Sequence, residues 1–237
     1  MKGIFDIDGP IMTFMSKLAD IMIVNFCMLI CCIPIFTIGA AITAAHKVFL
    51  QMALSEDQVK IIRTFFRGFK ENFKQATAVW AVLMVAILGL VCNVILIMAY
   101  CKGALAVILY ILLGLLTLIV TMICNFLFPL MARYQNTVKE HIHNAIYLSL
   151  LRIYTSLIMI AVLAVPIVLW NSSTEILMSS WMYWVLVGLA LPIYLDSRLL
   201  KRIFQGLEKA KAKKEGQLPE SEDVDAYEED AAGEETE

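Results

Sequence analysis

Residues 76–100 read ATAVWAVLMVAILGLVCNVILIMAY, a long and entirely uncharged stretch. It contains no Asp, Glu, Lys, Arg or His. It is also longer than the about 20 residues with which an α-helix crosses a hydrocarbon core about 30 Å thick. A second stretch of this kind, residues 103–132, follows almost at once. In lipid only helices and closed barrels satisfy the backbone, and the alternation of barrel strands is absent, so the two stretches predict membrane helices.

Three further apolar blocks, at residues 21–45, 153–170 and 180–195, extend this pattern over most of the chain. Of the 237 residues, 60% are hydrophobic and 17% are charged, whereas soluble domains are about half apolar and a quarter charged. The sequence therefore predicts an all-α, polytopic helical membrane protein. We expect a membrane domain over residues 1–206 and a basic, then acidic cytoplasmic tail over residues 207–237, largely disordered because it is so rich in charge.

The number of membrane crossings depends on Pro34. This proline lies in the middle of the first apolar block, where it breaks or kinks a helix, and a threonine and a glycine follow it within five residues. A helix over about residues 10–33, a tight turn, and a second helix over about residues 37–54 would give six spans. A single crossing over residues 21–45 would give five. We favour six spans and keep five as the alternative.

The distribution of basic residues predicts the orientation, since Lys and Arg concentrate in cytoplasmic loops. They occupy the segments between the first and second blocks, between the third and fourth blocks, and after the last block. Of the two remaining loops, one holds Lys102 and the other holds no basic residue. We therefore expect a multi-pass protein of the cell membrane with a cytoplasmic C-terminus. With six spans the N-terminus is cytoplasmic as well.

The sequence pattern over about residues 58–75 predicts a basic amphipathic helix on the cytoplasmic side. At 100° per residue its basic side chains share one arc, and the opposite face is formed by phenylalanines and an isoleucine. Such a helix suits the headgroup region, where anionic lipids add about 1 kcal/mol per Lys or Arg. We expect it to anchor the cytoplasmic face, and the alternative is a docking surface for a partner protein. The basic residues are Lys60, Arg63, Arg67, Lys70 and Lys74.

No motif in the chain predicts catalysis, a cofactor, a metal or nucleic-acid binding. Residues 5–10, FDIDGP, are like the D-x-D-G start of aspartate-nucleophile phosphatases. That chemistry needs a buried parallel sheet, which a helical membrane chain lacks, so we expect Asp8 or Gly9 to cap a helix with Pro10 in its first turn. None of the histidines has the further ligands of a metal site. We expect a non-enzymatic protein.

Polar side chains inside the apolar blocks are costly in lipid and often mark function. Thr117, Thr121 and Asn125 recur at i, i+4 and i+8, so they form one polar stripe on the third block. The stripe serves either a solute pathway or hydrogen bonds between helices. Because we find no Lys, Asp or Glu at mid-membrane and no P-loop, the sequence gives little support to transport by this chain alone. The candidate intramembrane polar residues are Asn25, Asn93, Thr117, Thr121, Asn125 and Arg152.

Several motifs together resemble the YesL-like family of bacterial membrane proteins. They are FDIDGP at residues 5–10, KLAD at 17–20, CCIPIFTIGA at 31–40 and FFRGFKENFKQA at 65–76. The resemblance extends to about Gly206. It implies a bacterial cell-membrane protein without established biochemical activity, associated with carbohydrate-uptake transporters and membrane sensors. The motif positions that we interpret as structural are Asp8, Gly9, Pro10, Asp20, Pro34, Thr37 and Gly39.

Two functions are therefore expected. The first is a non-enzymatic accessory or regulatory component linked to carbohydrate uptake, which contacts a sugar transporter or a membrane sensor as well as anionic lipid headgroups. The second is a small-solute transporter that acts by itself along the polar stripe of the third block.

Overall fold

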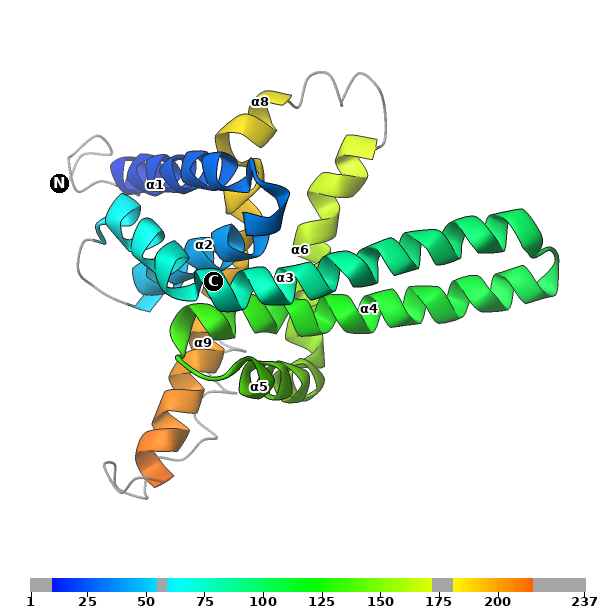
Figure 1. The fold of residues 1–237 in the computed structure, drawn as a ribbon. Coiled ribbons are helices and arrows are strands. Elements are labelled where there is room, and N and C mark those ends of the chain that lie inside the picture. The colour runs from blue at the N-terminus through cyan, green and yellow to red at the C-terminus, as the bar shows by residue number, and fades with distance from the viewer. Residues whose placement is uncertain (1–9, 55–58, 172–180, 215–237) are drawn as a thin grey trace, which may run out of the picture. The chain divides into compact units, whose positions relative to one another are not determined.

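The computed structural model describes residues 10–54, 59–171 and 181–214, and every regular element in these ranges is helical (Figure 1). Asp8, Gly9 and the acidic tail lie outside the described residues. The elements are α1 (Pro10–Cys32), the 3₁₀ turn η1 (Ile35–Thr37), α2 (Ile38–Leu54), α3 (Ile61–Tyr100), α4 (Ala104–Arg133), α5 (Val138–Leu151), α6 (Ile153–Asn171), α8 (Trp181–Tyr183), the π-helical turn η2 (Trp184–Gly188) and α9 (Ala190–Lys214).

Within the described ranges, four helices are long and apolar enough to cross a membrane: Ile11–Cys32, Ile35–Leu54, Ile61–Tyr100 and Ala104–Arg133. Two bent pairs raise this number to six if each pair is one span. The first pair joins α5 and α6 at 99°, and the second joins α8 and η2 to α9 at 41°. The predicted class, an all-α membrane protein with several spans, is confirmed.

The chain divides into two compact units, residues 1–199 and residues 200–237. The first unit contains α1 to α6, α8, η2 and the beginning of α9, and the second begins within α9. All features described below belong to the first unit.

The chain forms a helical hairpin at Pro34 and does not cross in one helix over residues 21–45. α1 ends at Cys32, and the Thr37 hydroxyl donates hydrogen bonds to the carbonyls of Cys31 and Pro34, the latter at 2.7 Å. These bonds satisfy carbonyls that the end of α1 and the turn leave without helical partners. The single-crossing alternative is therefore wrong at this point, and the helix–turn–helix prediction is confirmed.

α2 packs against the first half of α3 through a face of small residues. A Cβ added to Gly39 would lie 2.6 Å from Trp80 Cβ and 2.7 Å from the Ala76 carbonyl oxygen, so the two helices approach as closely as glycine allows. The Trp80 indole N–H donates to the Ile35 carbonyl at 2.8 Å and ties the turn to α3. Small residues allow this approach between helices in membranes. The small buried residues of α2 are Gly39, Ala40, Ala41, Thr43, Ala44 and Ala45.

The predicted amphipathic helix at residues 58–75 and the span that follows it form one continuous helix, α3, of 40 residues. Its apolar face is partly covered by protein, because Phe65 is fully buried in a core built with α1, α2 and α9. Ile62 and Phe66 remain 55% and 47% exposed. The segment therefore joins the helical core directly and does not lie apart from it as a separate surface helix.

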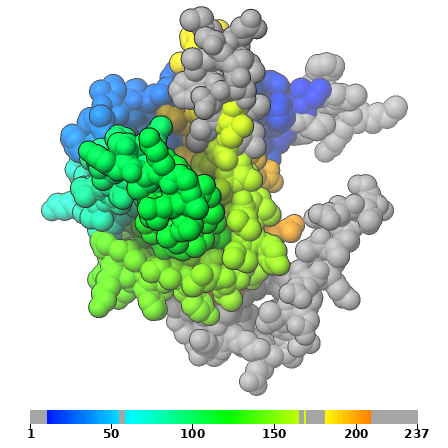
Figure 2. Space-filling view, turned by 90° about the vertical axis from the view of Figure 1, so that its right-hand side faces the viewer, coloured from blue at the N-terminus to red at the C-terminus, as the bar shows by residue number. Residues whose placement is uncertain are grey.

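Beyond Trp80, α3 continues for about 20 residues, or about 30 Å, past the level at which the α1–α2 turn is tied to it. Here α3 and α4 lie side by side as a long hairpin (Figure 1), and Figure 2 shows the molecule from the tip of this hairpin. Its apolar side chains point outward; Val82, Val85 and Met98 are each about 70% exposed. A surface this apolar and free of charge is suited to contact with hydrocarbon.

Replacing Gly39 with Ala tests the close contact between α2 and α3. The added Cβ would fall 2.6 Å from Trp80 Cβ, and overpacking of this kind costs about 1–3 kcal/mol. We expect the thermal unfolding midpoint of the purified protein in detergent to fall. Gly114→Ala in α4 is the matched control: its Cβ would meet no atom of the described chain within 4 Å, and Ala favours a helix over Gly by about 0.5–1 kcal/mol. Equal thermal unfolding midpoints for the two variants would contradict the close contact between α2 and α3.

Candidate functional site

A cavity of about 460 Å³ lies between the helices of the first unit. Its walls come from α1, α2, α3, α4, α6, η2 and α9, and most of its lining is apolar. Sites for small molecules typically measure about 300–1,000 Å³ and combine an apolar lining with a few polar groups. Apart from cysteines and tryptophans, the polar side chains that line this cavity are His46, Thr117, Thr121, Asn125 and Asp196.

The structure brings the predicted polar stripe of α4 to this cavity. The hydroxyls of Thr117 and Thr121 donate to the carbonyls one turn earlier, Leu113 and Thr117, each at 2.8 Å. Their protons are therefore used within α4, while oxygen lone pairs remain available. Asn125 is 9% exposed, and its Nδ2 has no hydrogen-bond partner among the described residues. The stripe thus contributes two acceptors and one unsatisfied donor.

Asp196 was not among the functional residues predicted from the sequence. This residue follows directly after the apolar block at residues 180–195, so the pattern placed it outside the membrane. In the structure α9 continues past it inside a bent candidate span, and Asp196 is 3% exposed and lines the cavity. Its Oδ1 has no hydrogen-bond partner within the described part of the chain. Asp196 therefore lies within a candidate span, a position that was not predicted for it from the sequence. The available signal was that Leu199 and Leu200 continue the apolar pattern beyond the aspartate.

His46 of α2 is a second ionisable residue on the cavity wall that the sequence analysis did not select. It is 5% exposed, and its Nδ1 lies 3.2 Å from Ser197 Oγ in a buried hydrogen bond. Since Ser197 follows Asp196, this bond joins α2 to α9 beside the unsatisfied carboxylate. Two ionisable side chains from different helices therefore line one apolar cavity.

Asn25 contacts the backbone of another helix and does not line the cavity, whereas a residue of a solute pathway would line it. Its amide group donates to the Trp184 and Val185 carbonyls at 3.2 and 2.8 Å. Its carbonyl oxygen accepts from the backbone N–H groups of Leu189 and Ala190, each at 3.0 Å. Asn25 is fully buried and is not among the residues that line the cavity. One side chain of α1 thus satisfies four backbone groups of another helix.

Pro192 lies just beyond a break in this helix. A proline lacks the N–H that would bond the carbonyl of the residue four positions earlier, here Gly188, and its ring clashes with that carbonyl. The preceding turn widens into the π-helical η2, and the axis bends by 41° between η2 and α9. Asn25 supplies the hydrogen bonds that the regular helix loses at this break.

Two other predicted polar residues do not line the cavity. Asn93 is exposed on α3 and donates to the Gly89 carbonyl of its own helix at 2.8 Å. Arg152 is exposed at the junction of α5 and α6, where its backbone N–H donates to the Leu148 carbonyl at 2.9 Å. Among the motif residues, Pro10 begins α1, and Asp20 is half-buried on the same helix.

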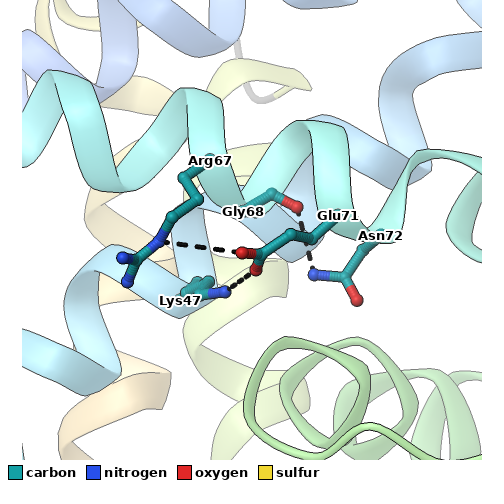
Figure 3. A network of polar contacts seen from close by, with 5 residues as sticks. All are labelled: Lys47, Arg67, Gly68, Glu71 and Asn72. Atoms are coloured by element: carbon teal, nitrogen blue, oxygen red, sulfur yellow. Dashed lines mark hydrogen bonds and ion pairs between the residues drawn. The ribbon is translucent and has the colours of Figure 1, made fainter.

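Polar contacts join α2 to the basic half of α3 (Figure 3). Glu71 forms an ion pair with Lys47 of α2, and its other carboxylate oxygen lies 3.8 Å from Arg67 Nε. Asn72 Nδ2 donates to the Gly68 carbonyl at 3.0 Å. Arg67 is therefore paired within the protein. All five predicted basic residues of this segment are exposed: Lys60, Arg63, Arg67, Lys70 and Lys74.

The helices and the cavity define a multi-pass helical membrane protein with a binding-sized space between its candidate spans. Residues 21–94 match the family model described as "Protein of unknown function, DUF624". The matched part includes the α1–α2 turn and all the residues of α1, α2 and α3 that line the cavity. No curated protein and no solved structure matches the chain.

Replacing Asn25 with Leu tests the architectural role of this residue. The variant leaves four backbone groups at the helix break without their partner, and an unsatisfied buried polar group costs about 1–3 kcal/mol. We expect a clear fall in the thermal midpoint in detergent. Asn93→Leu makes the same change at an exposed position with a bond inside its own helix, and should leave the midpoint unchanged. A wild-type midpoint for Asn25→Leu would refute the assignment.

Proposed function

We propose that the protein binds a small, predominantly apolar solute with one polar end in this cavity and carries it across the membrane without catalysing a reaction. The observation that supports the proposal most directly is Asp196, a buried ionisable side chain that faces a cavity of about 460 Å³. A buried polar group without a partner costs about 2–7 kcal/mol, and a solute that supplies the partner offsets this cost. Ionisable residues within spans are functional candidates for this reason.

The break beside α9 supports movement of the solute. The π-helical turn η2 and the 41° bend lie directly before the segment that carries Asp196. π-helical turns often occur at functional sites, and many transporters place their solute sites at discontinuous helices. Because η2 and α9 both contribute to the cavity wall, a change of angle at the break would alter the access to Asp196.

The composition of the lining narrows the solute class. A free sugar presents hydroxyl groups on most of its surface, and each buried hydroxyl needs a hydrogen-bond partner. The cavity offers few such partners, since most of its lining is apolar. The polar solute that the α4 stripe suggested is therefore replaced by an amphipathic one, with its polar end near Asp196 and Asn125.

Cys124 provides a direct test because this free thiol lines the cavity. A variant that retains Cys124 and has Ala at the other cysteines is reconstituted in sealed liposomes. Membrane-impermeant methanethiosulfonate reagents of either charge are then added to one side at a time. We expect at least one reagent to modify Cys124 from each side, because a carrier opens its site to both. A matched variant retains Cys92, which is exposed on α3 away from the cavity and should stay unmodified in lipid.

Ala86→Trp should slow this labelling by filling the cavity, and Ala99→Trp should not, because Ala86 lines the cavity and Ala99 does not. Labelling of Cys124 from one side alone would overturn the carrier proposal and leave a one-sided binding pocket. If the reagents modify Cys124 from neither side, the cavity is closed to solvent on both sides. This result would overturn the proposal entirely.

The exposed basic face of α3 favours a second candidate function. We propose that Lys60, Arg63, Lys70 and Lys74, which are exposed, contact anionic lipid headgroups or an acidic surface of a sugar transporter or membrane sensor. Arg67 is paired with Glu71 and contributes less to such a surface. This candidate is the accessory role in carbohydrate uptake that the resemblance to the YesL-like family implies.

The accessory role is tested by neutralising Arg63 and Lys70 together as Gln. If the face binds a transporter, co-purification of a sugar-transporter subunit from native membranes should fall several-fold while membrane insertion stays normal. Lys102→Gln, an exposed charge just beyond the other end of α3, is the control and should retain the complex. Loss of membrane insertion with the double variant would instead assign the face to lipid anchoring.

A further inference from the structure

We propose that the cavity selects organic cations and that Asp196 is the anionic group that holds them. The inference rests on the proposed binding of a solute and names its chemical class. It is argued from the charge, the aromatic rings and the hydrogen-bond inventory of the cavity wall.

The wall of the cavity, as the described residues form it, has one acidic side chain, Asp196, and no basic Lys or Arg beside it. The ion pairs of the described residues do not include Asp196. Burial of a carboxylate in apolar surroundings is costly unless a cation or hydrogen-bond donors approach it. A positively charged solute would supply what the described protein does not.

Two tryptophans, Trp80 and Trp184, also line the cavity. The indole N–H of Trp80 is already used, since it donates to the Ile35 carbonyl at 2.8 Å. Trp80 therefore offers a ligand its ring and no donor. Indole rings attract cations, and quaternary ammonium groups are commonly recognised by aromatic side chains in this way.

The hydroxyl groups of the wall present acceptors to a bound solute. Thr117 and Thr121 donate their protons within α4 and present lone pairs, and His46 Nδ1 is engaged with Ser197. Nδ2 of Asn125 is a buried donor of the wall that has no partner among the described residues. An anion would meet the Asp196 carboxylate and the hydroxyl oxygens of Thr117 and Thr121. An ammonium group meets acceptors and rings, and the apolar lining covers its hydrocarbon body.

Two probes of the same shape test the role of charge. Benzyltrimethylammonium carries a quaternary nitrogen, and neopentylbenzene has carbon in the same position. The full chain is placed in zwitterionic lipid nanodiscs, and binding is followed by quenching of tryptophan fluorescence and by the thermal shift, with empty nanodiscs as the blank. We expect the wild-type protein to bind the cation at least about tenfold more tightly than the neutral probe, relative to lipid partitioning.

Asp196→Asn should remove most of this preference and leave the affinity for the neutral probe within about twofold, because the amide keeps the shape and removes the charge. Retained binding of the neutral probe shows that the variant is folded. Asp196→Glu should keep the preference for the cation. Asp20→Asn makes the same chemical change on α1 away from the cavity wall and should behave as the wild-type protein.

Equal affinity of the wild-type protein for the two probes would overturn cation selection while leaving solute binding intact. Loss of both probes in Asp196→Asn would also overturn it, because Asp196 would then shape the cavity and not select charge. If the wild-type protein binds neither probe, the cation proposal fails. The labelling of Cys124 decides independently whether the cavity is reachable, so this failure is distinguishable from failure of the carrier proposal.

Discussion

The close approach of α2 to α3 is the constraint on which the rest of the structure depends. Gly39 allows the α2 backbone to lie against Trp80, and the Trp80 N–H then reaches the Ile35 carbonyl in the turn. This arrangement places the start of α2 and the middle of α3 on one wall of the cavity, which includes Trp80 and His46. A larger residue at Gly39 would separate the helices and change the shape of that wall, because a helix pair cannot widen at one contact without moving its neighbours.

The polar side chains within the candidate spans fall into two groups according to their partners. Asn25 uses both its donor and acceptor groups on the backbone at the helix break. Asp196 and Asn125 each keep an atom without a partner in the described chain, and both line the cavity. In a low-dielectric interior a satisfied polar group strengthens the architecture, whereas an unsatisfied one is costly. The presence or absence of a hydrogen-bond partner therefore separates the structural polar residues from the candidate binding residues.

The basic segment and one part of the cavity wall belong to a single helix, α3. α3 runs from Ile61 to Tyr100 without a break, so Arg63, Lys70 and Trp80 lie on one continuous helix. The ion pair of Glu71 with Lys47 and the approach of Arg67 fasten the basic half to α2. This continuity connects the two candidate functions physically, since a partner or lipid bound at the basic face would contact the helix that also forms the solute site.

The sequence alone determined the elements whose causes are local. Residues 76–100 and 103–132 form helices because their backbone must be satisfied within each segment in lipid, and Pro34 ends α1 because its ring prevents a continuous helix. The i, i+4, i+8 spacing likewise identified the stripe of Thr117, Thr121 and Asn125. The tertiary structure decided that Asn25 serves a helix break about 160 residues further along the chain, and that Asp196 faces a cavity. Periodicity specifies which face of a helix is polar, but the partner of that face depends on the fit between surfaces distant in sequence, which no local pattern records.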